Sequence, residues 1–102
     1  MDYLKRSEEL FEETVENRRH LHQMPELGLE LPETTAFIME KLTEMGYDPK
    51  PCGGGVVACV GKTGGKTVLL RGDVDALPMK EESGLPFASQ RENAHTCGHD
   101  IH

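Results

Sequence analysis

The fold class is decided by residues 53–70, which read GGGVVACVGKTGGKTVLL. Two short runs rich in valine and leucine, 56–60 and 67–70, flank a glycine-containing segment at 62–66. Glycine adopts positive φ at no steric cost, and apolar runs on either side of such a segment are typical of a β-hairpin. The sequence therefore predicts strands near 56–60 and 67–71.

The residues before this stretch follow a helical pattern instead. Apolar side chains recur at the spacing of one helix face from about residue 2 to 21, and again over 32–45. Pro25 cannot continue the first helix, Pro32 is favoured at the first position of the second, and Gly46 suits a C-terminal cap. The predicted fold is α/β, with two N-terminal helices packed on a mixed sheet.

Length and charge exclude several classes of protein. The 102 residues are enough for one small domain. Eighteen acidic against eleven basic residues give a formal charge of −7, which disfavours nucleic acid and anionic membrane surfaces as partners. No apolar run approaches the roughly 20 residues that span a bilayer, and no secretory signal is visible. Three cysteines, an odd number, suggest a reducing compartment, so we expect a cytoplasmic protein.

Two carboxylates follow the second predicted strand, in LRGDVDALP at residues 70–78. In an extended backbone the side chains of Asp73 and Asp75 point the same way. They could orient a metal-bound histidine, bind a metal directly, or act as acid and base. The simpler alternative is that aspartate begins a turn after a strand, which an isolated Asp-x-Asp favours.

A denser cluster closes the chain, HTCGHDIH at residues 95–102. Thiolate and imidazole are the usual ligands of zinc and related divalent metals. Cys97 and His99 lie two residues apart, so an extended backbone could direct both toward one ion, and Gly98 relieves crowding. Asp100 and His102 could support them or add a ligand. The alternative is a polar loop with an incidental cysteine.

The remaining candidates favour structural roles. His20 and His22 end the first helix, where histidine more often faces solvent or interacts with the last carbonyls than binds a metal. We expect Cys59 to be a small core residue of a strand and Cys52 to be a loop thiol.

Three motifs occur in order along the chain: RRHLHQMPELGLE at 18–30, LRGDVDALP at 70–78 and HTCGHDIH at 95–102. This set closely resembles the start of the M20 family of metallo-amidohydrolases. The most similar branch contains hippurate hydrolases, N-acyl-amino-acid amidohydrolases, N-acetyldiaminopimelate deacetylases and auxin-conjugate hydrolases. The resemblance covers almost the whole chain, from about residue 10 to 102.

The resemblance implies a zinc-peptidase-like catalytic domain with a divalent metal site. Cys97 and His99 match the family's metal ligands, and Asp75 matches its catalytic acidic residue. One or two ions of zinc, manganese, cobalt or nickel would serve hydrolysis of N-acyl amino acids, such as hippurate-like or N-acetyl compounds. Family members also carry a general-base glutamate, further ligands and an inserted domain that often mediates dimerisation. Residues 1–102 are therefore expected to be an incomplete N-terminal portion of the domain, inactive alone, from a protein that could form a homodimer.

Two other classes of function stay open. The chain could be a truncated metal-binding or interaction module without catalysis. It could also belong to a hydrolase in which Cys97 is the nucleophile, flanked by His99 and Asp100. Activity that resists chelators would distinguish the second of these from a metal-dependent enzyme.

Overall fold

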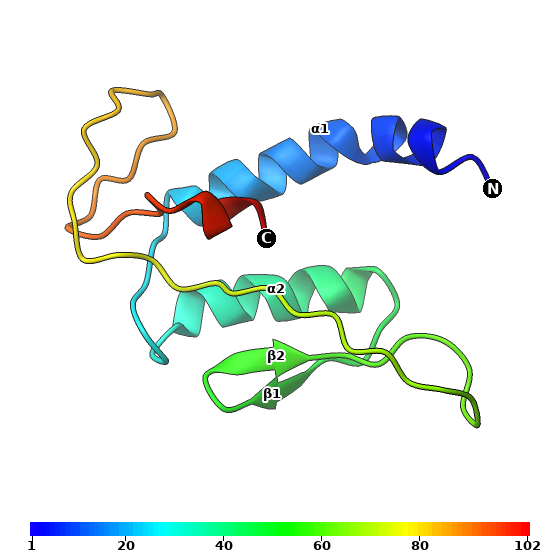
Figure 1. Ribbon diagram of the computed structural model, residues 1–102. Coiled ribbons are helices and arrows are strands. Elements are labelled where there is room, and N and C mark those ends of the chain that lie inside the picture. Colours follow the sequence, from blue (N-terminus) through cyan, green and yellow to red (C-terminus); the bar gives the residue numbers. More distant parts are fainter.

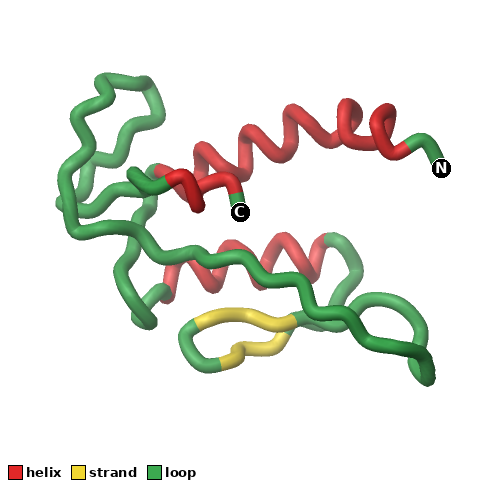
Figure 2. The backbone as a smooth tube through the Cα atoms, viewed as in Figure 1, coloured by secondary structure: helices red, strands yellow, loops and turns green.

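Two helices are followed by a small hairpin and a long stretch of loop (Figure 1, Figure 2). The computed structural model describes residues 1–102. Its elements are α1 (Tyr3–His22), α2 (Pro32–Glu44), β1 (Lys50–Cys52), β2 (Gly55–Val57) and the 3-10 helix η1 (Gly98–Ile101). The predicted combination of N-terminal helices with a sheet is confirmed. Of the two predicted strands, the one near 56–60 is present in part, as β2, and the one at 67–71 is absent. The sheet is two-stranded and antiparallel, not mixed.

The charges at the two ends of α1 suit the helix dipole. The Asp2 carboxylate accepts a hydrogen bond from the Lys5 amide (3.1 Å) and caps the first turn, and the last turn carries Arg19, His20 and His22. Only the C-terminal part of the helix packs on other elements. Leu4 and Phe11, on the predicted apolar face, are 71% and 61% exposed, and the first turns project away from the molecule (Figure 1).

The start of α2 is capped from outside the helix. Leu31 precedes the helix and has no side chain that can accept a hydrogen bond. The Glu26 carboxylate accepts instead from the amides of Thr34 (2.7 Å) and Glu33 (3.3 Å). A carboxylate at this place satisfies free N–H groups and complements the positive end of the helix dipole. Gly46 follows the last turn with φ of +91°, as expected of a helix C-terminus.

The hairpin forms earlier in the chain than the sequence predicted. Strands β1 and β2 pair antiparallel, with Pro51 opposite Val56, and Gly53 turns between them with φ of +59°. Residues 58–60 and 67–71 form no strand. A strand needs a partner for its N–H and C=O groups. Residues 50–52 provide that partner for β2, because the loop that joins them to β2 is shorter than the loop that joins β2 to residues 67–71. The side chains of Val68, Leu69 and Leu70 are consequently 81–91% exposed.

The predictions for two cysteines also need correction. Cys59 is exposed because residue 59 lies beyond the end of β2 and packs in no core. Cys52 belongs to strand β1 and not to a loop, although its side chain is exposed as expected.

A small core forms beside the C-terminal end of α1. The inter-helix loop, the segment after residue 72 and the residues before 95 meet there. Eight of the 102 residues are buried. The Ala76 amide donates to the Glu26 carbonyl (2.7 Å), and Leu77 pairs with Ala94 through two backbone hydrogen bonds of 3.0 Å. These bonds hold the segment after residue 72 between the inter-helix loop and the residues that precede the 95–102 segment. No helix is long and apolar enough to cross a membrane.

Candidate metal centre

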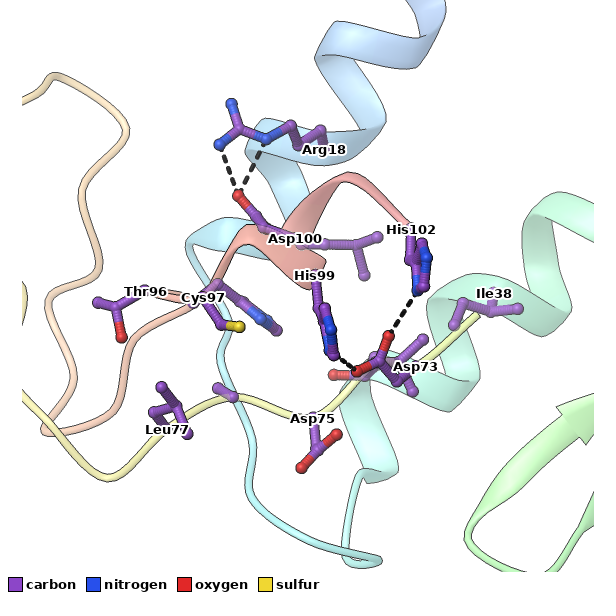
Figure 3. A pocket seen from close by; sticks show the side chains of 15 residues that line it. Arg18, Ile38, Asp73, Asp75, Leu77, Thr96, Cys97, His99, Asp100 and His102 are labelled. Atoms are coloured by element: carbon purple, nitrogen blue, oxygen red, sulfur yellow. Dashed lines mark hydrogen bonds and ion pairs between the residues drawn. The ribbon is translucent and has the colours of Figure 1, made fainter. Parts of the chain in front are cut away.

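A cavity of about 410 Å³ brings the three sequence motifs together (Figure 3). Its walls come from the C-terminal part of α1, from α2, from the segment after residue 72 and from the 95–102 segment. The lining residues include Arg18, Thr34, Ile38, Asp73, Asp75, His95, Cys97, His99, Asp100 and His102. Residues far apart in sequence thus face one space, and both predicted metal ligands and the predicted catalytic aspartate are among them.

The 95–102 segment turns sharply within the predicted ligand pair. Cys97 has an extended backbone (φ −98°, ψ 152°), but η1 begins at Gly98. The amides of Asp100 and His102 donate to the carbonyls of Cys97 (3.1 Å) and His99 (2.9 Å). The extended backbone expected from Cys97 to His99 therefore ends at Cys97, and a helical turn determines where His99 points.

Asp73 accepts hydrogen bonds from two imidazoles. His99 Nδ1 lies 2.8 Å from Oδ2 and His102 Nδ1 lies 3.0 Å from Oδ1, and the two rings stack with centroids 5.3 Å apart. The bonds from His102 and His99 hold the pKa of Asp73 at about 2, below its ordinary value of 3.8. The carboxylate is therefore ionised, and each Nδ1 is the donor. In the neutral ring this leaves Nε2 with a free lone pair.

Asp75 lies in the same wall but is oriented differently. In Figure 3 the Asp73 carboxylate points toward the two histidines, whereas that of Asp75 points away from them. Asp75 is exposed and takes part in none of the hydrogen bonds or ion pairs of the chain. Its carboxylate is thus free to meet a ligand. The Asp-x-Asp spacing identified both residues, but it could not tell which of them contacts the histidines.

The end of α1 contacts the 95–102 segment through charged and aromatic side chains. Arg18 Nε and Nη2 lie 3.0 and 2.5 Å from Asp100 Oδ2. His22 is buried and its Nε2 lies 2.7 Å from Glu81 Oε1. His20 stacks on Phe37, with ring centroids 4.4 Å apart. His20 is exposed, as the sequence predicted, and neither histidine is placed as a metal ligand. The prediction that His22 faces solvent or the last carbonyls is wrong, because its ring is buried and bonds to Glu81.

His95 is a donor that the sequence identified only as part of a cluster. The imidazole is half-buried in the cavity wall, and burial lowers its pKa because the charged ring loses hydration. The neutral ring is the form that binds metals. Whether His95 is neutral, and so able to bind a metal, depends on its burial, which residue spacing in the sequence does not reveal.

The thiol, imidazole and carboxylate groups of the cavity are donors that suit a divalent metal, but they do not form a complete coordination shell. No group of three or more His, Cys, Asp or Glu side chains has the geometry to hold an ion. Cys97 is a free, exposed thiol on the cavity wall, and the hydrogen bond from His99 Nδ1 to Asp73 is the arrangement that orients metal-bound histidines. Cys97 and His99 therefore fit as part of a coordination shell.

Comparison with known proteins identifies relatives over most of the chain. It is 49% identical over 89 residues to N-acetyl-L-cysteine deacetylase of Bacillus subtilis, covering 83% of this chain and 21% of the relative. It is 41% identical over 99 residues to N-acetyldiaminopimelate deacetylase of Limosilactobacillus fermentum, covering 89% and 26%. A search of family models gives no match.

The fold has a counterpart among solved structures. The YXEP protein of Bacillus subtilis, a dinuclear metal-binding peptidase from the M20 family, superposes with a TM-score of 0.82. The two chains are 35% identical, and the match covers 91% of this chain and 27% of that one.

Sequence and fold together define the class, that of the M20 metallohydrolases. The chain belongs to the M20 family, as its three motifs predicted. It spans between 21% and 27% of the length of the relatives it matches.

Proposed function

We propose that this chain forms part of the active site of a metal-dependent amidohydrolase that cleaves the amide bond of N-acyl amino acids. The observation that carries the proposal is the shared cavity of Cys97, His99, Asp73 and Asp75 in a chain of this family. The names of the relatives favour acetyl as the acyl group, and hippurate-like substrates remain part of the proposal. The three free, exposed cysteines suit a cytoplasmic protein.

Each side chain has a stated part in this proposal. The Cys97 thiolate and His99 Nε2 would hold the metal, and Asp73 fixes the tautomer and orientation of His99. Asp75, which makes no hydrogen bond or ion pair within the chain, would accept or return a proton at its carboxylate in the cavity wall. A bound divalent ion supplies Lewis acidity, polarising the acyl carbonyl and lowering the pKa of water. Zinc, manganese, cobalt and nickel all accept these donors.

The proposal is tested on the full-length protein with N-acetylcysteine, N-acetyldiaminopimelate and hippurate as substrates. We expect hydrolysis that a chelator abolishes and added metal restores. Cys97→Ser and His99→Ala should lose bound metal and activity together. Cys59→Ser, which removes another exposed thiol, is the matched control and should change neither. Wild-type metal content in both site variants would refute the assignment, and activity that resists chelation would favour Cys97 as a nucleophile.

A substitution at Asp75 separates catalysis from folding. Asp75→Asn keeps the size and removes the charge, and this carboxylate has no partner in the chain, so the free energy of unfolding should change by less than about 0.5 kcal/mol. The turnover number should fall by a factor of roughly 10² to 10⁴, the usual contribution of a general acid or base. Near wild-type turnover with unchanged stability would remove Asp75 from the catalytic role.

The 102 residues alone are expected to be inactive. Two metal ligands leave half of a tetrahedral shell to water, and no third protein ligand lies in place. Hydrolysis by the isolated chain that disappears in Asp75→Asn would contradict this expectation. Metal binding without hydrolysis by any longer form of the protein would favour the non-catalytic module.

A further inference from the structure

We infer that Arg18 is a positioning residue for the 95–102 segment, which it holds through Asp100 so that Cys97 and His99 face the cavity. The inference rests on the proposed metal site and adds a residue of α1 whose hydrogen bonds go to Asp100 and not to either proposed ligand. Arg18 and Asp100 are 82 positions apart in sequence. Their contact therefore fixes the position of η1 relative to α1, two elements that are far apart along the chain.

Asp100 lies at the centre of the turn that orients the proposed ligands. Its amide donates to the Cys97 carbonyl, and it follows His99 directly within η1. Its carboxylate is largely buried, with 12% of the side chain exposed, and Oδ2 accepts from both Nε and Nη2 of Arg18. This oxygen is occupied by the guanidinium, so Asp100 acts through the turn and is not a free metal ligand. Figure 3 shows the two bonds between Arg18 and Asp100 among the residues that line the cavity.

The helix end that carries Arg18 is itself fixed. One turn later, buried His22 bonds to Glu81, which also accepts from Ser83 Oγ and the Ser89 amide. Between them, the Arg19 guanidinium lies 4.6 Å from the centre of the Phe87 ring. Arg18 therefore projects from a helix end that is anchored by these contacts. Its guanidinium can determine where the Asp100 carboxylate lies, in addition to neutralising its charge.

The 95–102 segment is thus held on two sides. On one side His99 and His102 bond to Asp73, and on the other Asp100 bonds to Arg18. If the Arg18 contact is lost, a largely buried carboxylate loses both of its hydrogen bonds. The other basic group beside it, His22 Nδ1, lies 3.8 Å from Oδ2, beyond hydrogen-bond distance, so the carboxylate should turn toward water. That motion would pull on the turn between Cys97 and His99, while the bonds to Asp73 would remain.

The experiment compares R18Q, R18K and D100N with the wild type in the full-length protein. The control is R6Q, which removes an arginine–glutamate pair (Arg6–Glu9, 3.0 Å) on the same helix, away from the cavity. The first readout is amide hydrogen exchange of residues 97–102 without metal. The second is Co²⁺ titration followed by the thiolate-to-cobalt absorption, which reports ligation by Cys97.

We expect R18Q and D100N each to speed exchange in 97–102 by roughly threefold to tenfold, since Arg18 is partly exposed and its ion pair is screened. The double variant R18Q/D100N should be no faster than either single variant, because both remove the same contact. R18K should restore part of the protection, and R6Q should match the wild type. Co²⁺ affinity should fall in R18Q and D100N and not in R6Q.

Unchanged exchange in R18Q, equal acceleration in R6Q, or additive effects in the double variant would each overturn the inference. Should R18Q fail to fold, R18K and D100N allow the same comparison. If the wild type shows no cobalt absorption that depends on Cys97 while R18Q still speeds exchange, the proposed metal function fails and the positioning role of Arg18 stands.

Discussion

At the scale of single residues, the site depends on one carboxylate that contacts two histidines. Asp73 accepts from Nδ1 of His99 and of His102, which determines the tautomer of both rings. Partners of this kind orient metal ligands, and their loss typically costs ten- to a hundredfold in metal affinity. Of the two aspartates in the 70–78 motif, Asp73 therefore contacts the histidines, and Asp75 is the one for which we propose the catalytic role.

This assignment predicts the pH dependence of Asp73. The pKa of the folded-state carboxyl is about 2, against 3.8 ordinarily, so its hydrogen bonds contribute to stability above pH 3.8 and are lost as the pH falls through about 2. NMR of the metal-free protein should follow the Asp73 carboxyl carbon to a midpoint near 2. His102→Phe removes the larger cause and should raise that midpoint toward 3.8. A midpoint near 3.8 in the wild type would contradict the geometry.

At the scale of elements, the hairpin is placed against the inter-helix loop by a glycine. Gly54 follows the turn residue Gly53 and lies against Leu29. A Cβ built on Gly54 would lie 2.7 Å from the Leu29 carbonyl oxygen and 2.8 Å from the Leu29 Cβ. No side chain fits there without displacing backbone, so the close approach of β1 and β2 to residue 29 requires glycine.

A pair of glycine substitutions tests this contact. Gly54→Ala should lower the free energy of unfolding by about 1–3 kcal/mol, the usual cost of forcing atoms into filled space. Gly65→Ala is the matched control, because its Cβ would meet nothing within 4 Å. It should be neutral or stabilise by up to about 1 kcal/mol, because alanine restricts the unfolded chain. Denaturant unfolding measures both, and equal effects would show that the loop contact is unimportant.

At the scale of the whole molecule, the chain is more extended than a compact domain of its size. Its radius of gyration is 15.3 Å, against about 13 Å for a typical 100-residue domain. The expansion accompanies exposed apolar side chains on the first turns of α1 and along 68–70. Unpaired, apolar, extended segments of this kind readily associate with other strands.

We therefore predict that the isolated 102-residue chain self-associates through residues 68–70. Leu69→Lys should increase the monomer fraction, because a charge on an unpaired segment opposes edge pairing. Leu69 is 82% exposed, so the substitution should leave the fold intact. Size-exclusion chromatography with light scattering measures the effect. Glu82→Lys adds the same positive residue at another exposed position and is the control. Equal monomer fractions for wild type and Leu69→Lys would place association elsewhere.

The sequence by itself determined the family, the two helices and the three motifs that contribute most of the residues lining the cavity. Helix periodicity and proline positions are local properties, and α1 and α2 lie within a residue or two of their predicted bounds. The three motifs are specific because each combines several chemically constrained residues, which is why they predicted the family that the relatives confirm.

Only the tertiary structure decided which strands pair and which aspartate contacts the histidines of the site. An apolar run in the sequence does not predict which segment pairs with β2, because strand pairing depends on which segments the tertiary fold brings together. Spacing likewise grouped Asp73 with Asp75 and Cys97 with His99, but η1 and the fold direct Asp73, not Asp75, to the histidines. The contact of Arg18 with Asp100 spans 82 positions, and no local pattern encodes a pairing across that distance.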